Sequence, residues 1–288
     1  MARVTDAAWR CRDHTFPLGE RTLVMGIVNV TPDSFSDGGT LATADEAVAH
    51  ALQLAADGAD ILDVGGESTR PGSDPVAVEE ELARVVPVLA GLRAAAPEGV
   101  ALSVDTRRPE VARAGLEAGA SIVNDVTAAA DPTMFAVVRE AGAGLVLMHM
   151  LGEPKTMQRN PRYDDVVREV RVMLAGRIGA AVAAGVPRDR LCVDPGIGFG
   201  KNLDHNLALL HDIEAFEELR VPVLVGTSRK RFIGQLTGVD EPAERVEGTA
   251  GAVAWCAAKG VDVVRVHDVL EMTRVVRVVD AIARGGSA

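Results

Sequence analysis

Cysteine, aromatic residues and positive charge are all scarce in this 288-residue sequence. The three cysteines, Cys11, Cys192 and Cys256, are odd in number and widely spaced, which argues against a disulfide framework or a zinc site and predicts free thiols in the core. The formal net charge of -11 argues against nonspecific binding to nucleic acid or to an anionic membrane, because both need a basic surface. An anionic ligand must therefore find a local basic pocket.

Long apolar runs are also missing. No stretch approaches the roughly 18 consecutive apolar residues of a membrane span, and the first 21 residues mix charges without an apolar stretch of signal-peptide length. We therefore expect a cytoplasmic protein that is not attached to a membrane.

Short apolar runs rich in β-branched residues alternate with longer, Ala-rich amphipathic segments along the whole chain. The predicted strands are residues 23–30, 60–65, 101–105, 121–126, 144–149, 191–194, 221–226 and 261–266. This alternation predicts an α/β protein with one (β/α)8 TIM barrel over residues 21–288, preceded by a lead-in over residues 1–20. A doubly wound open sheet is the alternative, but the GxGxxG motif is missing after the first strand.

Almost every predicted strand ends in a polar side chain. These side chains belong to Asn29, Asp63, Asp105, Asn124, Asp125, His149, Asp194, Ser228, Arg265 and His267. In a barrel the carboxyl ends of the strands share one face, which is where barrel enzymes place their chemistry. One such residue is more often a helix cap or a loop hydrogen bond, whereas the whole set favours a site.

The composition of this set suggests a class of ligand. Carboxylates and amides with one lysine suit a flat heterocycle, because an Asp accepts two parallel hydrogen bonds from an amino-imine edge. Lys230, Arg265 and His267 follow the last two strands, the usual anion site of a barrel. We expect Arg229 and Arg231 to be solvated residues at a helix start. Neither a His/Cys cluster nor a nucleophile with a paired base is apparent, so zinc and covalent catalysis are not favoured.

Two segments resemble the signature segments of the dihydropteroate synthase family: MGIVNVTPDSFSDGG at residues 25–39 and DVGGESTRPGS at residues 63–73. The similarity continues in family order through SVDT, NDV, LMHM, GEPKTMQ, DPGIGFGK, SRK and RVHDV, over about residues 23–270. The resemblance implies a (β/α)8 barrel that joins 6-hydroxymethyl-7,8-dihydropterin diphosphate to p-aminobenzoate in folate synthesis and releases pyrophosphate. It also implies Mg²⁺ and a homodimer.

The resemblance assigns roles to individual residues. The pterin residues are Asp105, Asn124, Met148, Asp194, Phe199 and Lys230. The diphosphate residues are Asn29, Asp63, Thr69, Arg265 and His267, with Asn29 also binding Mg²⁺. The p-aminobenzoate residues are Phe35, Thr69, Arg70, Pro71, Ser228 and Lys230. The catalytic residues are Asp105, Lys230, Arg265 and His267, with Asp33 and Phe35 from a loop at residues 31–39 that folds over the site together with residues 67–73.

The arylamine is already a nucleophile, so the chemical demand lies in the departure of pyrophosphate. A dihydropterin can spread positive charge from its exocyclic carbon into the ring, which favours an SN1-like path. Asp105 and Asp194 would stabilise that charge, while Mg²⁺, Arg265 and His267 would stabilise the departing anion.

Two other hypotheses stay open. One is a methyltransferase that shares the pterin-binding barrel and passes a methyl group from methyltetrahydrofolate to a corrinoid protein, which the combination of TPDSFSDGG, ESTRPGS and SRK disfavours. The other is a catalytically dead paralogue that only binds pterin or a partner enzyme, which the intact Asn29, Asp105, Lys230 and His267 disfavour. Pyrophosphate release that depends on p-aminobenzoate distinguishes all three.

Overall fold

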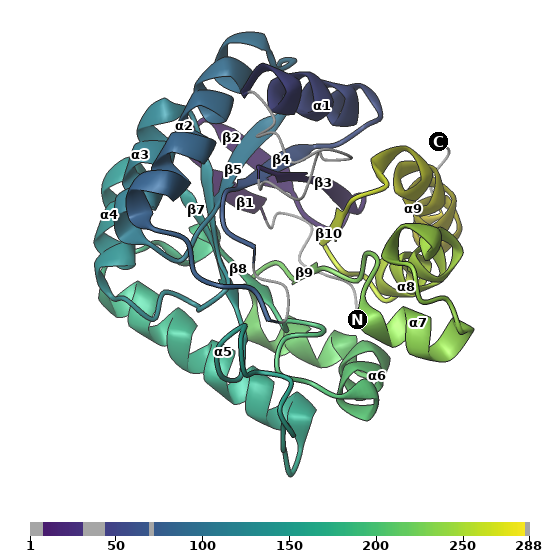
Figure 1. The fold of residues 1–288 in the computed structure, drawn as a ribbon. Helices are drawn as coiled ribbons and strands as arrows, with labels where there is room; N and C mark the ends of the chain where they lie inside the picture. The colour runs from purple at the N-terminus through teal and green to yellow at the C-terminus, as the bar shows by residue number, and fades with distance from the viewer. Residues whose placement is uncertain (1–7, 31–43, 69–71, 286–288) are drawn as a thin grey trace.

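The computed structural model describes residues 8–30, 44–68 and 72–285. Within them, helices surround a central ring of strands (Figure 1). The strands of the ring are β3 (Leu23–Asn29), β4 (Ile61–Gly65), β5 (Ala101–Asp105), β6 (Ile122–Asp125), β7 (Gly144–Met148), β8 (Leu191–Asp194), β9 (Leu224–Val225) and β10 (Val263–Val266). Each of these strands lies inside one of the predicted runs.

The strands form one parallel sheet that closes on itself. Their hydrogen-bonded order is β8-β7-β6-β5-β4-β3-β10-β9. A parallel bridge between Val193 of β8 and Val223, just before β9, joins the two ends of this order. The predicted barrel is therefore confirmed, and the open doubly wound sheet is wrong because an open sheet leaves two unpaired edge strands.

Helices follow the strands and cover the outside of the ring. They are α1 (Ala44–Ala56), α2 (Val78–Ala95), α3 (Pro109–Ala118), α4 (Thr133–Ala141), α5 (Val166–Ala183), α6 (Leu203–His211), α7 (Arg231–Thr237), α8 (Val246–Ala258) and α9 (Val269–Arg284). Local sequence sets several of their ends: Pro109 opens α3 at its first turn, and Gly142 ends α4 in the left-handed conformation at φ 63°. The outward strand residues and the inward helix faces form the larger apolar core.

A β-hairpin that the sequence reading did not predict precedes the barrel. Strands β1 (Ala8–Cys11) and β2 (His14–Pro17), purple in Figure 1, pair in an antiparallel manner. Trp9 is fully buried, and its indole N–H donates to the carbonyl of Arg190 at 3.0 Å. The hairpin packs against the first residues of several barrel strands, among them Ile61 and Ile122. It therefore fills the amino end of the barrel.

The inward face of the barrel strands changes character along their length. Met25 and Ile61 belong to the apolar cluster inside the amino end. Because side chains alternate across a strand with period two, Asn29 on β3 and Asp63 on β4 point inward as well, nearer the carboxyl end. The same alternation places the polar residues of the other strands above an apolar floor. The inward polar side chains near the strand ends therefore form one layer at the carboxyl end of the barrel, which we call the polar cup.

Candidate active site

Arg265 on β10 lies at the centre of the polar cup. Its Nε donates to Asp63 Oδ2 at 2.7 Å, and its Nη2 donates to Asp105 Oδ2 at 2.7 Å. Asn124 Nδ2 donates to the same oxygen of Asp63 at 2.9 Å. Four residues from four strands, far apart in sequence, therefore form one hydrogen-bonded group, as the shared carboxyl face predicted.

Burial dominates the electrostatics of this group. It raises the pKa of Asp105 to about 7, with Arg265 opposing the rise and Asp63 adding to it. Burial also works against the charge of Arg265, but the carboxylates of Asp63 and Asp105 outweigh it and raise the arginine pKa. The other oxygen of Asp63, Oδ1, is buried and has no hydrogen-bond partner among the described residues. The centre therefore contains a carboxylate oxygen, Asp63 Oδ1, that can still accept a hydrogen bond beside the positively charged Arg265.

Asp194 and Lys230 form the second half of the cup. Asp194 Oδ1 accepts from the backbone N–H of Gly196 at 2.7 Å, and Lys230 Nζ lies 4.1 Å from the centre of the Phe199 ring. Burial raises the pKa of Asp194 to about 6, against the Gly196 hydrogen bond and nearby cations. Burial lowers the pKa of Lys230 to about 8, with Asp194 opposing that change. This half offers a carboxylate, an ammonium and an aromatic face.

Strand register places the remaining predicted pterin residue in the same layer. Met148, 3% exposed, ends β7 and pairs in register with Asp194. Likewise Asp105 pairs with Asn124. The predicted pterin residues therefore lie at the carboxyl ends of neighbouring strands, in the turn after β8 or, for Lys230, in the turn after β9.

Ser228 and His267 meet beyond the ends of β9 and β10. The Ser228 hydroxyl accepts from the backbone N–H of His267 at 3.1 Å and lies 3.0 Å from His267 Nδ1. The prediction that Arg229 is merely solvated is wrong, because its Nε donates to Asp268 Oδ2 at 3.1 Å in a partly buried ion pair. Arg231 is exposed, as predicted. The Arg229 pair thus ties the Ser228 turn to the His267 turn.

Asp125 shows that a polar strand end can also be structural. Its Oδ1 accepts from the Thr127 backbone N–H at 2.7 Å and from the Thr127 hydroxyl at 2.6 Å. The neighbouring Asn124 bonds Asp63 inside the barrel, so Asp125 faces the other way. It holds the loop after β6 and does not join the cup.

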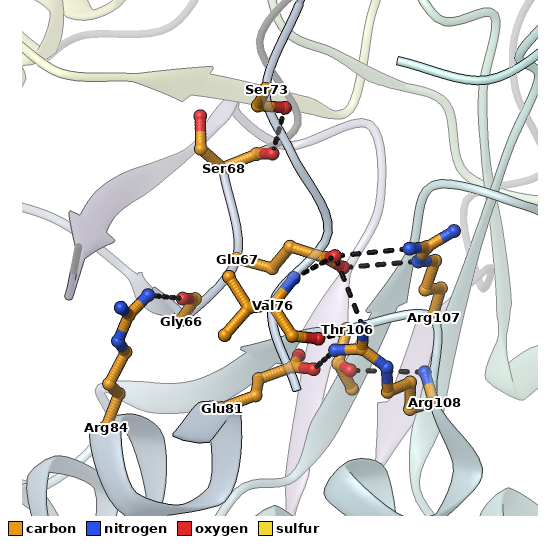
Figure 2. A network of polar contacts seen from close by, with 10 residues as sticks. All are labelled: Gly66, Glu67, Ser68, Ser73, Val76, Glu81, Arg84, Thr106, Arg107 and Arg108. Carbon is orange, nitrogen blue, oxygen red and sulfur yellow. Dashed lines mark hydrogen bonds and ion pairs between the residues drawn. The ribbon is translucent and has the colours of Figure 1, made fainter. Parts of the chain in front are cut away.

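The segment after β4 is anchored by an ion network that the sequence reading missed. Figure 2 shows the Glu67 carboxylate between Arg107 and Arg108, and Arg107 donates to both of its oxygens at 3.1 Å. Arg108 also pairs with the fully buried Glu81. Ser73 Oγ donates to the Ser68 carbonyl at 2.5 Å. The Glu67 network and the separate Ser73–Ser68 hydrogen bond thus anchor described residues on both sides of residues 69–71.

Five predicted site residues lie outside the residues that the structure describes. They are Asp33, Phe35, Thr69, Arg70 and Pro71. Their roles stay predictions. Lys201, in contrast, is a buried residue of the site region that the sequence reading passed over, although it directly follows the glycine-rich turn DPGIGFG.

The chain matches the family model described as pterin binding enzyme over residues 25–267. It is 48% identical over 258 residues, 90% of each chain, to the dihydropteroate synthase of Escherichia coli strain K12. It also resembles the structure of the Xanthomonas albilineans dihydropteroate synthase with 4-aminobenzoic acid, at a TM-score of 0.89 and 49% identity, covering 96% of this chain and 98% of that one. The same enzyme in complex with 7,8-dihydropteroate matches at a TM-score of 0.86 and 47% identity, covering 96% and 98% of the two chains.

Proposed function

This chain belongs to the dihydropteroate synthase family of pterin-binding enzymes, and from that membership we propose how it performs the reaction. It condenses 6-hydroxymethyl-7,8-dihydropterin diphosphate with p-aminobenzoate to give 7,8-dihydropteroate and pyrophosphate. The observation that supports this most is the arginine at the centre of the cup, because Arg265 joins Asp63 and Asp105 while Lys230 and Asp194 stand beside it.

The pterin would lie in the half of the cup that contains Asp194 and Lys230. Asp194 and Asn124 provide acceptors and donors for the edge of the heterocycle, and Phe199 and Met148 provide apolar surface for its faces. Lys230 completes the set, since its ammonium lies over the Phe199 ring and would donate to a ligand bound there. A flat ring with mixed polar edges suits these side chains.

The pyrophosphate leaving group would depart toward Arg265, Ser228 and His267. Arg265 carries a fixed positive charge, since its neighbours raise its pKa. The carboxylates of Asp105 and Asp194 would stabilise the positive charge that spreads from the exocyclic carbon into the pterin as the C–O bond breaks. This charge arrangement supports an SN1-like path in which p-aminobenzoate attacks after the bond has weakened.

The arylamine would enter beside Ser228 and Lys230. Both residues follow β9, next to the proposed path of the leaving group. Phe35, Thr69, Arg70 and Pro71 complete this subsite as predictions, together with Asp33.

The donors present fit a Mg²⁺ ion that arrives with the substrate. The described residues contain no group of three or more His, Cys, Asp or Glu side chains placed to hold a metal. Mg²⁺ is commonly held by one or two protein oxygens together with substrate phosphates and waters. Asn29 is the last residue of β3 and the only one in that strand that is not buried, so its side chain is partly exposed at the carboxyl end of the strand. Bound there, Mg²⁺ would neutralise charge on the diphosphate.

The assay that tests this proposal measures pyrophosphate release from the pterin diphosphate with and without p-aminobenzoate. Release that requires p-aminobenzoate supports the synthase, whereas its absence in folded protein supports a binding-only paralogue. Methyl transfer from methyltetrahydrofolate to a corrinoid protein would support the third hypothesis. Lys230→Ala and Asp105→Ala should lose measurable turnover while remaining folded, and wild-type release by either variant would count against the assigned roles.

We also propose a homodimer in the cytoplasm. An apolar groove lies between α6, α7 and α8. Leu207, Leu236 and Trp255 line it together with exposures of 37%, 57% and 42%, and contiguous exposed apolar patches mark interaction sites. Leu236→Arg should convert a dimer to a monomer in light scattering, and a wild-type monomer would contradict the proposal. Within the described residues, no helix combines the length and the hydropathy needed to cross a membrane.

A further inference from the structure

Lys201 is a buried lysine whose amine contacts only uncharged acceptors. It lies in the turn after β8 and is 2% exposed. Its Nζ lies 2.9 Å from the carbonyl oxygens of Gly196 and Phe199, and 3.0 Å from His149 Nδ1. Burial lowers the pKa of His149 to about 3, with the charge of Lys201 adding to the effect, so the ring is neutral near pH 7 and its Nε2–H tautomer presents Nδ1 as an acceptor.

These contacts match the protonated amine. An ammonium has three N–H donors and no acceptor, and three carbonyl oxygens surround Nζ, those of Gly196, Phe199 and, at 3.4 Å, His149. A neutral amine has only two N–H donors and would leave one of these oxygens without a donor. Burial lowers the pKa of Lys201 to about 7, while Asp194 opposes that change. The carbonyl oxygens and Asp194 therefore favour the cation at a place where burial opposes it.

The lysine connects two separate parts of the cup. His149 directly follows Met148 of β7, and its backbone N–H donates to the Asp194 carbonyl at 2.9 Å. Gly196 donates to the Asp194 side chain, and its carbonyl also accepts from the Phe199 N–H at 3.1 Å. Lys201 thus bonds Phe199 itself and the two residues, His149 and Gly196, whose backbone N–H groups donate to Asp194.

The glycines of this turn show how tightly it packs on the end of β7. Gly196 has φ +69°, and a Cβ there would lie 1.9 Å from the His149 carbonyl oxygen. Gly200 has φ +63°, and a Cβ there would lie 2.4 Å from the Leu151 carbonyl oxygen. Only glycine fits both positions, which brings the turn close enough for one amine to reach both strands.

We infer that Lys201 is a positioning residue of the pterin pocket, which fixes Phe199 and Asp194 and keeps the Asp194 carboxylate charged. The inference rests on the proposed function. Lys201 does more than pack this turn, because its charge, like the charges of Lys230 and Arg265, opposes the rise in the pKa of Asp194. The other titratable groups coupled to Asp194 are the thiols of Cys192 and Cys256, and burial raises the pKa of both, so they stay neutral.

Arg190 provides a matched control at the other end of the same two strands. It directly precedes β8, and its Nη1 donates to the carbonyl of Gly142, just before β7. Both cations therefore tie β7 to β8 through backbone carbonyls. Arg190 does so at the amino end, beneath the apolar floor, and Lys201 does so at the cup.

The test compares Lys201→Met, Lys201→Arg and Arg190→Met by initial rates of pyrophosphate release over a range of pH. Lys201→Met should lower kcat/KM for the pterin diphosphate by up to about 10²-fold, because small displacements of positioning groups cost this much. The KM for p-aminobenzoate should change little. The acid limb of the pH profile should move to higher pH, since Asp194 loses a neighbouring cation.

Lys201→Arg separates charge from geometry. It should raise the KM for the pterin substrate and leave the acid limb where the wild type has it. Arg190→Met should lower the melting temperature but change neither the KM for the pterin substrate nor the acid limb of the pH profile. If Lys201→Met does not fold, Lys201→Arg still decides, because wild-type pterin KM in that variant overturns the inference. Equal losses for both substrates with an unmoved acid limb also overturn it, whereas a wild type without p-aminobenzoate-dependent release overturns the proposed function instead.

Discussion

The two ends of the barrel are built on the same strands but have opposite chemistry. At the amino end the interior holds Trp9, Met25 and Ile61, covered by the β1-β2 hairpin. At the carboxyl end, two to four residues further along each strand, it holds Asp63, Asp105 and Arg265. Both ends lie inside the protein, so burial alone does not make a site. The barrel gains stability from one end and places charges for chemistry at the other.

Two cations beside β8, the half-buried Arg190 and the buried Lys201, make the same comparison sharper. Arg190 and Lys201 flank β8, and each donates to backbone carbonyls. The carbonyls bonded by Lys201 belong to the turn that carries Phe199, whereas the carbonyl bonded by Arg190 ends a helix far from the cup. The same kind of interaction therefore holds the fold in one place and, as we infer, positions the proposed pterin pocket in the other.

The largest expected effect comes from removing the central cation of the cup. Arg265→Met should lower kcat/KM by about 10²- to 10³-fold or more, since it removes a preorganised charge. It should also destabilise the fold by about 3 to 5 kcal/mol, because Asp63 and Asp105 are left buried without their partner. Steady-state kinetics and urea unfolding measure the two effects. If Arg265→Met keeps the wild-type kcat/KM and the wild-type free energy of unfolding, Arg265 does not link the residues of the cup.

A cavity at the amino end should affect stability alone. Trp9→Ala removes a fully buried side chain and should lower the free energy of unfolding by about 3 to 5 kcal/mol. At a temperature where the variant remains folded, kcat and both KM values should equal those of the wild type. A specific rise in the pterin KM would mean that the two ends communicate, and the comparison would fail.

The pH dependence of kcat/KM tests the protonation states that we assign to residues of the cup. The carboxylates of Asp194 and Asp105 must be charged to accept hydrogen bonds, and burial raises the pKa of these groups to about 6 and about 7. Lys230 must be protonated to donate, and burial lowers its pKa to about 8. The kcat/KM for the pterin substrate should therefore fall below about pH 7, more steeply below about pH 6, and again above about pH 8. A flat profile across this range would contradict the assignment.

The same shifts predict a stability trend. Asp194 and Asp105 have folded-state pKa values above those of an unfolded chain, so the stability they contribute is present at acid pH and declines as the pH rises through about 6 to 7. At neutral pH the charged forms of Asp194 and Asp105 therefore lower the stability of the fold, although the proposed reaction needs both groups charged.

The smallest effect is expected for an exposed ion pair at the amino end. Arg21 donates to both oxygens of Asp60 at 2.8 and 2.6 Å, but more than half of the arginine side chain is exposed. Arg21→Met should change the free energy of unfolding by less than about 1 kcal/mol, with unchanged kinetics. A larger loss in urea unfolding would mean that this pair helps to close the barrel.

The sequence predicted the strands and most of the cup because both depend on local pattern. Buried parallel strands show as short apolar runs, and the barrel brings their ends together whatever their spacing in sequence. Asn124 and Asp125 mark the limit, because adjacent polar residues point to opposite faces and only the structure shows that Asp125 holds a loop.

The missed features depend on tertiary contacts. Lys201 is buried because glycines let its turn approach β7, and a lysine after a turn would ordinarily be solvated. Arg229 pairs with Asp268, which is 39 residues away. The first strand of the hairpin did show as an alternation in the sequence, since Trp9 and Cys11 alternate with charged neighbours. The alternation is short and lies in a charged segment, so it did not predict a strand.

One pair of variants on a single strand tests the central claim most directly. Cys192 and Asp194 lie two residues apart on β8, on the same inward face, on either side of the change from apolar floor to polar cup. The measurement is kcat/KM for the pterin diphosphate in Asp194→Asn and Cys192→Ala. We expect a loss of about 10²- to 10³-fold for Asp194→Asn and wild-type kinetics for Cys192→Ala. Equal values for the two variants would contradict the account.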